Sequence, residues 1–262
     1  MTTSIFSSAA LALTVFASLS VSAPALASTI TTGLTAYWSF DEGAGNIAGD
    51  SSGNNFDGTI NGATWTSGIS GSALYFDGVN DTVNYSGFGM TGETSFSVSA
   101  WVNRSLTNGN NCCGQIVGQR NNNAWSLRYD NRDNKPVEFI VTPSWQGDNG
   151  NQGASIAADE WHHITGVLDT NLLNLYVDGI LEHSMSYAGS VGGGGAYGAI
   201  GGALDGYFHG VIDEVRIYDR ALTAADVNAV MADATGTVPE PSVLALMGLG
   251  IFGLGLARRK MK

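Results

Sequence analysis

The sequence predicts an all-β fold, an antiparallel β-sandwich. One observation is that short runs alternate apolar and polar side chains, which is the period of a strand with one buried face. A second is that turn sequences such as DGVND, SSGNN and GGGG follow these runs at close intervals. Residues 28–232 are long enough to bury a core, and we expect them to form one domain.

The first element along the chain, residues 1–27, is predicted to be a secretory signal peptide. Its apolar run ends in Ala25-Leu26-Ala27, a small-x-small cleavage site, so we expect cleavage after Ala27. The segment before the apolar run contains no Lys or Arg, and only the amino terminus supplies positive charge there. The rest of the chain is therefore expected to be exported.

The alternation also assigns strand faces. SFSVSAWVN places Phe96, Val98, Ala100 and Val102 on one face, and LNLYVDGILE contains Asp178-Gly179, a two-residue hairpin turn. GVIDEVRIYD alternates in the same way, with Val211, Asp213, Val215 and Ile217 on one face. The Asp213 carboxylate is therefore expected to point into the core or its rim.

One helix is predicted in LTAADVNAVM. Thr223 is placed as an N-cap, and Asp226 follows three residues later, which is close to a capping box. The helix follows the last strand, and we expect it to pack across the end of the sandwich. Residues 233–237 then form a short linker.

The carboxyl-terminal tail, residues 238–262, has three parts. Val238-Pro239-Glu240-Pro241 comes first, an uncharged apolar stretch follows, and Arg258 and Arg259 begin a basic end. As a helix the apolar stretch spans roughly 25 Å, a little less than the roughly 30 Å hydrocarbon core of a bilayer. We predict a transmembrane helix over residues 242–257, with the basic end in the cytoplasm.

The net charge limits which molecules the protein is expected to bind, and the two cysteines raise the question of a disulfide. The net charge of −12 disfavours nucleic acid and suits an extracellular protein or one that collects divalent cations. Cys112 and Cys113 are adjacent in a polar loop, where we expect them to be accessible. A vicinal disulfide, an intermolecular bridge and two free thiols all remain open, and no catalytic role is predicted for the pair.

Several stretches resemble a known family. LTAYWSFDEGAGNIAGDSSGNNFDGTI, SALYFDGVNDTVNY, SFSVSAWV, EWHHITGVLDTNLLNLYVDG and GVIDEVRIYDRALTAADV follow in an order similar to a laminin G-like domain of the concanavalin A-like lectin/glucanase superfamily. This resemblance implies a jelly-roll sandwich. The tail resembles a PEP-CTERM sorting signal, which implies processing by an exosortase-type membrane protease in a bacterium with an outer membrane, usually one that makes exopolysaccharide.

The superfamily contains enzymes, but the motif of its retaining glucanases, Glu-x-Asp-x-x-Glu, is absent. The closest stretch, Ile212-Asp213-Glu214-Val215, would place its two carboxylates on opposite faces of a strand. The sequence also lacks Gly-x-Ser-x-Gly, a phosphate-binding loop and His-Glu-x-x-His. No catalytic residue is predicted.

Calcium is the favoured metal, since Asp- and Asn-rich loops supply oxygen ligands. The candidate ligands are Asp50, Asn54, Asp77, Asp81 and Asp213, and the resemblance makes a structural calcium plausible because relatives of this fold often carry one. The alternative is that these residues form turns in which each Asp accepts hydrogen bonds from backbone N–H groups.

A sugar-binding site is predicted in two polar loops. Trp145 is a single large aromatic residue in TPSWQGDNGNQG, while Asn121 and Asn123 could hydrogen-bond sugar hydroxyls. Trp145 could equally fix its loop to the sandwich. We therefore predict an exported, non-catalytic protein of the cell surface or exopolysaccharide matrix that binds carbohydrate. The alternatives are binding to another surface protein, a glycan-cleaving enzyme and a purely structural matrix protein.

Overall fold

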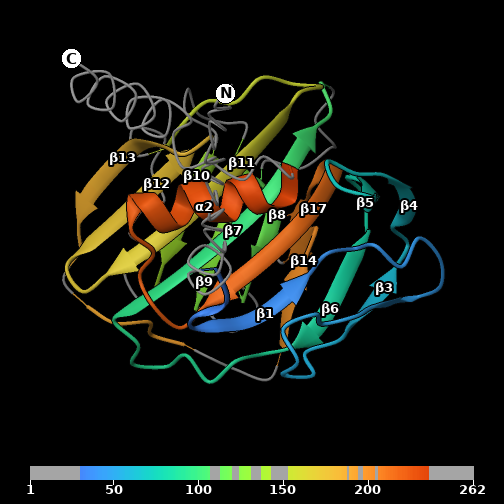
Figure 1. The fold of residues 1–262 in the computed structure, drawn as a ribbon. Helices are drawn as coiled ribbons and strands as arrows, with labels where there is room; N and C mark the ends of the chain where they lie inside the picture. Colours follow the sequence, from blue (N-terminus) through green and yellow to red (C-terminus); the bar gives the residue numbers. More distant parts are fainter. Residues whose placement is uncertain are drawn as a thin grey trace, which may run out of the picture.

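A computed structural model describes residues 30–106, 113–119, 124–130, 137–142, 153–187, 189–193, 197–203 and 206–235. It confirms the predicted architecture of two β-sheets packed face to face with one helix near the end of the described chain (Figure 1). Neighbouring strands are antiparallel, with one exception among the described pairs, a short parallel pairing of Tyr207 with Gln115.

Sheet A has eight strands. Its order is β13 (Ile180–Ser186), β12 (Leu172–Val177), β11 (Trp161–Asp169), β7 (Ser95–Arg104), β17 (His209–Tyr218), β5 (Ser72–Asp77) and β4 (Thr64–Ser67), and β1 (Leu34–Trp38) also pairs with β17.

Sheet B has nine strands. Its order is β10 (Val137–Val141), β9 (Trp125–Asp130), β8 (Cys113–Gly118), β14 (Tyr197–Ile200), β6 (Thr82–Ser86), β3 (Gly58–Asn61) and β2 (Ile47–Ala48), and β15 (Gly202–Ala203) and β16 (Gly206–Tyr207) pair beside β8.

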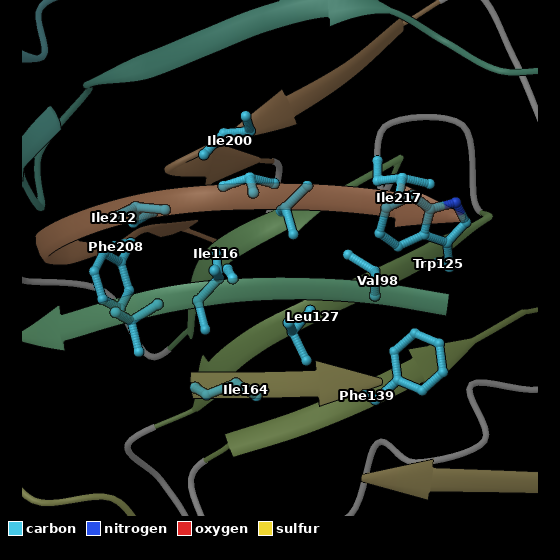
Figure 2. Packing of buried hydrophobic residues seen from close by; sticks show 14 of the residues in the cluster. Val98, Ile116, Trp125, Leu127, Phe139, Ile164, Ile200, Phe208, Ile212 and Ile217 are labelled. Carbon is cyan, nitrogen blue, oxygen red and sulfur yellow. The ribbon is translucent and has the colours of Figure 1, made fainter. Parts of the chain in front are cut away.

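The hydrophobic core lies between the two sheets. Val98, Ile164 and Ile217 project from sheet A toward Ile116, Leu127 and Phe139 of sheet B, and Phe208 fills one side (Figure 2). The face predicted for SFSVSAWVN is confirmed, since its four apolar residues all belong to this core. The predicted hairpin turn is also confirmed, because Asp178 and Gly179 join β12 to β13 and both have a positive φ.

The face assignment for β17 was wrong at its first half. A β-bulge lies between Asp213 and Arg216, where Glu214 has a φ of 53°. The extra residue shifts the alternation, so that Ile212 and Val215 both face the core. Asp213 lies opposite Trp101 of β7, on the outer face of sheet A, and not in the core between the sheets.

Helix α2 (Ala224–Thr235) begins with the predicted capping box. The Asp226 backbone N–H donates to Thr223 Oγ1, and the Thr223 backbone N–H donates to Asp226 Oδ2 at 3.0 Å. The predicted position of the helix was wrong, because α2 packs on the outer face of sheet A and not across the end of the sandwich (Figure 1). The side chains of Val167, Tyr176 and Tyr218 project from that face and pack against α2, which removes their apolar surface from water.

A buried polar network also joins α2 to sheet A. Arg216 is 2% exposed and donates from Nη1 to the Val230 carbonyl at 3.2 Å. Its Nη2 lies 2.7 Å from both Glu214 Oε2 and Asp233 Oδ2. The Tyr37 hydroxyl donates to Glu214 at 2.8 Å. Arg216 therefore connects strand β17 with a carbonyl and a carboxylate of the helix.

Several predicted segments lie outside the described residues. They are the signal peptide 1–27 with its cleavage site at Ala27, and the tail 238–262 with the predicted transmembrane helix 242–257. Within the ranges that the structure describes, no helix has the length and apolar character needed to cross a bilayer.

Candidate functional site

An open groove of about 540 Å³ lies on the outer face of sheet B, where β3, β6 and β14 run side by side. It is lined by Asp57, Thr59, Asn84, Tyr85, Ser86, Tyr197 and Gly198. The four side chains Thr59, Asn84, Ser86 and Tyr197 are exposed to solvent, so the groove opens outward.

Strand alternation and register build this groove. In β6, Val83 and Tyr85 point into the core, so Asn84 and Ser86 point outward. Thr59 of β3 lies opposite Asn84, and Tyr197 of β14 lies opposite Ser86, which places the four outward side chains in two neighbouring pairs.

A glycine helps to shape the wall of the groove. Gly198 lies opposite Tyr85, and a Cβ atom at this position would meet the Tyr85 ring at 2.2 Å. The Tyr85 ring therefore packs directly over the Gly198 backbone, while its hydroxyl donates to the Gly118 carbonyl at 3.1 Å. This packing fixes the strand from which Tyr197 projects, and Tyr197 is 62% exposed.

The chemistry of the groove suits a neutral polar ligand with flat, weakly apolar faces. Thr59, Asn84 and Ser86 offer hydroxyl and amide groups that both donate and accept hydrogen bonds. Tyr197 offers an exposed aromatic ring with a polar tip. Asp57 is the one charged residue in the lining, and its Oδ1 accepts the Asp50 backbone N–H at 2.8 Å. The sequence signal for this groove was the polar alternation of GTIN and TVNYS, which our sequence analysis had not used.

A buried charged cluster lies further along the outer face of sheet B and was also missed. Arg128 of β9 lies opposite Glu138 of β10, with Nη2 2.8 Å from Glu138 Oε2 and 3.3 Å from Asp130 Oδ2. All three residues are at most 3% exposed. A retaining glycosidase needs one carboxyl group as an acid and a second as a nucleophile. Here one guanidinium group is paired with both carboxylates.

The five calcium candidates lie at three separate places. Asp50 and Asn54 lie between β2 and β3, Asp77 and Asp81 flank the β5–β6 turn, and Asp213 is in β17. In the described ranges, no group of three or more His, Cys, Asp or Glu side chains is arranged to hold a metal ion.

Each of the four candidate aspartates accepts backbone N–H groups, as the turn interpretation predicts. Asp50 accepts those of Tyr37, Ser52 and Phe56. Asp81 accepts the Asp77 N–H at 2.9 Å, and Asp77 accepts the Val79 N–H at 2.8 Å.

The fourth aspartate, Asp213, and Asn54 also have protein partners. Asp213 accepts the N–H groups of Ile69, Ser70 and Glu214, at 2.9, 3.3 and 2.9 Å. The Asn54 side-chain amide donates to the Thr35 carbonyl at 3.0 Å. These hydrogen bonds agree with the turn interpretation, and calcium binding stays a prediction of the sequence.

The pKa directions differ between the two most connected carboxylates. Burial alone would raise the pKa of Asp50, but the N–H donors from Phe56 and Tyr37 outweigh it and lower the pKa below 3.8. At Asp213, which is fully buried, the loss of hydration outweighs the three N–H donors and raises the pKa of the carboxyl group to about 7.

Chelation of divalent ions is expected to leave the fold intact. Because the carboxylates already have backbone donors, we expect EDTA to change the melting temperature by less than about 2 °C, which corresponds to at most about 1 kcal/mol for a domain of this size. Differential scanning calorimetry with excess calcium and with EDTA measures this. A drop of about 10 °C on chelation would contradict the prediction and restore calcium as a structural ligand.

The two adjacent cysteines are partly described. Cys113, at the start of β8, is disulfide-bonded, which excludes the state with two free thiols. It is 2% exposed, so the expectation of an accessible pair was wrong for this residue. Cys112, the only other cysteine of the chain, lies outside the described residues.

The predicted sugar-binding residues Trp145, Asn121 and Asn123 also lie outside the described residues. The same holds for Val238, Pro239, Glu240, Pro241, Arg258 and Arg259 of the tail. The described lining of the groove consists of residues that no sequence pattern had pointed to.

Two antiparallel sheets with an outward polar groove define a lectin-like β-sandwich. Residues 76–228 match the family described as the concanavalin A-like lectin/glucanases superfamily, and the chain belongs to this superfamily. Residues 237–260 match the PEP-CTERM protein-sorting motif, which indicates export and a cell-surface location. A search of curated proteins gives no match.

Solved structures share the fold at low sequence identity. Domain 4 of AbnA, an extracellular arabinanase from Geobacillus stearothermophilus in complex with arabinotriose, is 24% identical with a TM-score of 0.61, and the match covers 75% of this chain and 97% of that one. The ligand-binding domain of botulinum neurotoxin serotype D in complex with N-acetylneuraminic acid is 18% identical, with a TM-score of 0.60 and coverage of 80% and 52%.

A sialidase from Trypanosoma rangeli is 15% identical, with a TM-score of 0.56 and coverage of 79% and 34%. This chain therefore spans about half of the neurotoxin domain and about a third of the sialidase. At these identities the likenesses show the fold, which is shared by binding domains and by an enzyme.

Proposed function

We propose that this protein is an exported, non-catalytic carbohydrate-binding protein of the cell surface or exopolysaccharide matrix. The observation that carries the proposal is the groove of sheet B, which combines the exposed Tyr197 ring with the hydroxyl and amide groups of Thr59, Asn84 and Ser86. Sugars present both hydroxyl groups and apolar C–H faces, and these side chains match both.

A non-catalytic role is supported by the carboxylates on the outer face of sheet B. Asp57 is the single acid in the lining, while glycoside hydrolysis usually uses a pair of carboxyl groups on either side of the bond. The carboxylates of Asp130 and Glu138 are paired with Arg128. The alternative of a glycan-cleaving enzyme is tested by incubating the protein with the glycans that it binds and measuring released reducing ends.

The domain organisation that goes with this function is also a proposal. The signal peptide 1–27 is removed after Ala27. The predicted linker 233–237 was too long at its start, because α2 continues to Thr235 and its Asp233 pairs with Arg216. The binding domain is therefore residues 28–235, and residues 236–237 link it to the tail. The tail holds the protein in the inner membrane through residues 242–257 until an exosortase-type protease processes it. The PEP-CTERM match over residues 237–260 supports this route to the cell surface.

Glycan binding is expected to depend on the ring of Tyr197. In a glycan-panel assay followed by calorimetry with the best ligand, Tyr197→Ala should weaken binding by about tenfold, because an aromatic contact contributes about 0.5–1.5 kcal/mol beyond its buried area. Tyr197→Phe should retain most of the affinity if stacking dominates.

Ile180→Ala serves as the control for this experiment. Ile180 is 64% exposed on sheet A, away from the groove, and its replacement should leave affinity unchanged. Equal binding by Tyr197→Ala and the natural protein would exclude the groove, and Trp145→Ala would then test the loop predicted from the sequence. A protein that binds no glycan on the panel would point to a protein partner or a structural matrix role.

A further inference from the structure

A second pocket, of about 330 Å³, lies at the end of the sandwich and is separate from the groove of sheet B. The connection between β6 and β7, residues 87–94, passes from sheet B to sheet A and forms one wall with Phe88 and Met90. Phe96 of β7 and Phe56, which precedes β3, add further apolar side chains to the lining. No residue lines both pockets.

The apolar walls are held in place by buried packing. Phe88, Met90 and Phe96 are 5%, 6% and 0% exposed. The rings of Phe56 and Phe88 meet edge to face with centroids 4.5 Å apart. The connection itself is fixed by hydrogen bonds from the Gly92 N–H to the Val191 carbonyl and from the Val191 N–H to the Glu93 carbonyl, both at 2.8 Å. The pocket is thus formed before any ligand binds, and its volume is that of a small ligand site.

Two carboxylates give this apolar pocket a charge. Glu93 lies on the connection before β7, and Asp219 directly follows β17, so they approach the pocket from different walls. Both are exposed, and within the described part of the chain neither side chain makes a hydrogen bond or an ion pair. None of the residues that line the pocket is Lys or Arg.

We propose that this pocket binds an organic cation with an apolar body, such as an amine that carries an aromatic or branched alkyl group. The apolar body would lie against Phe56, Phe88 and Met90, where removal from water is favourable. The ammonium group would face Glu93 and Asp219 at the mouth of the pocket.

A matched series of probes tests the proposal on the full chain. Phenethylamine, phenethyl alcohol and hydrocinnamate share one apolar body and carry a positive, a neutral and a negative group. Calorimetry and amide shifts in NMR spectra should show the amine binding about two- to fivefold more tightly than the alcohol, which is the range for exposed ion pairs. Hydrocinnamate should bind most weakly, and high salt should reduce the preference for the amine.

Variants of the two carboxylates distinguish the contribution of charge to ligand binding from that of apolar packing. Glu93→Gln and Asp219→Asn should each weaken amine binding by about two- to fivefold and leave alcohol binding unchanged. Glu182→Gln, an exposed carboxylate on the edge strand β13, should have no effect. The Tyr197→Ala variant should bind the amine normally, because Tyr197 belongs to the other pocket. The proposal is overturned if none of the probes binds, if all three bind equally, or if the two acid variants bind the amine as the natural protein does.

Discussion

Replacing Arg216 by Met is expected to destabilise the protein by about 3–5 kcal/mol, the cost of removing one partner from a buried ion pair. Glu214 is 3% exposed and would lose its guanidinium partner, and α2 would lose the hydrogen bond to the Val230 carbonyl and the ion pair with Asp233. Burial already raises the pKa of Glu214, and Arg216 opposes that rise. Without Arg216 the pKa should rise further.

Urea unfolding at neutral pH measures this loss. The double variant Glu214→Gln/Arg216→Met should be more stable than Arg216→Met alone, because it leaves no unpaired buried carboxylate. A loss of less than about 1 kcal/mol in the single variant would show that the network contributes little to holding α2, as is usual for exposed ion pairs. That result would contradict our account of the outer face of sheet A.

Acid is expected to destabilise the folded state through His163. Burial, helped by the nearby Arg216, lowers the pKa of His163 from 6.5 to about 3, and Nδ1 has no hydrogen-bond partner. Between pH 6.5 and 3 the unfolded chain binds a proton that folded His163 does not. Stability is therefore lost as the pH falls through this window, by about 4 to 5 kcal/mol at most.

The variant His163→Leu isolates this effect. Its stability relative to the natural protein should improve steadily as the pH is lowered from 7 to 3.5, as measured by urea unfolding at several pH values. Asp213 acts in the opposite direction, because its pKa is raised to about 7. The stability that protonated Asp213 contributes to the fold is fully present below pH 3.8 and is lost as the pH rises through 7. The stability of Asp213→Asn relative to the natural protein should therefore decrease as the pH is lowered, which is the opposite of the change expected for His163→Leu. Parallel curves for His163→Leu and the natural protein would show that His163 does not titrate in this way.

The sequence predicted the parts of the fold that depend on local pattern. The alternation in SFSVSAWVN, the Asp178-Gly179 turn and the Thr223/Asp226 capping box each involve residues a few positions apart, and all three are confirmed. The bulge in β17 was missed because a strict two-residue period was assumed over the whole of GVIDEVRIYD, although Val211-Ile212 and Asp213-Glu214 interrupt the alternation. The register that inserts Glu214 is set by pairing with β7, far away in the sequence.

The candidate site was less predictable for the same reason. Thr59, Asn84 and Tyr197 come from three strands separated by long connections, and none carries a motif. Composition drew attention to Trp145 and to the Asp-rich turns. The structure gives protein hydrogen-bond partners to Asp50, Asp77, Asp81 and Asp213. An acid in a turn looks the same in sequence whether it caps N–H groups or binds an ion.

By itself the sequence determined the all-β class, the family resemblance, the capped helix and the sorting tail, because each of these depends on residues that are contiguous or regularly spaced along the chain. Only the tertiary structure decided that α2 covers the outer face of sheet A, that Arg216 and His163 are buried beneath this side of the molecule, and that Tyr197 stands beside Asn84 and Ser86. These features depend on which strands pair and in what register, and pairing is a property of residues brought together by the folding of the whole chain.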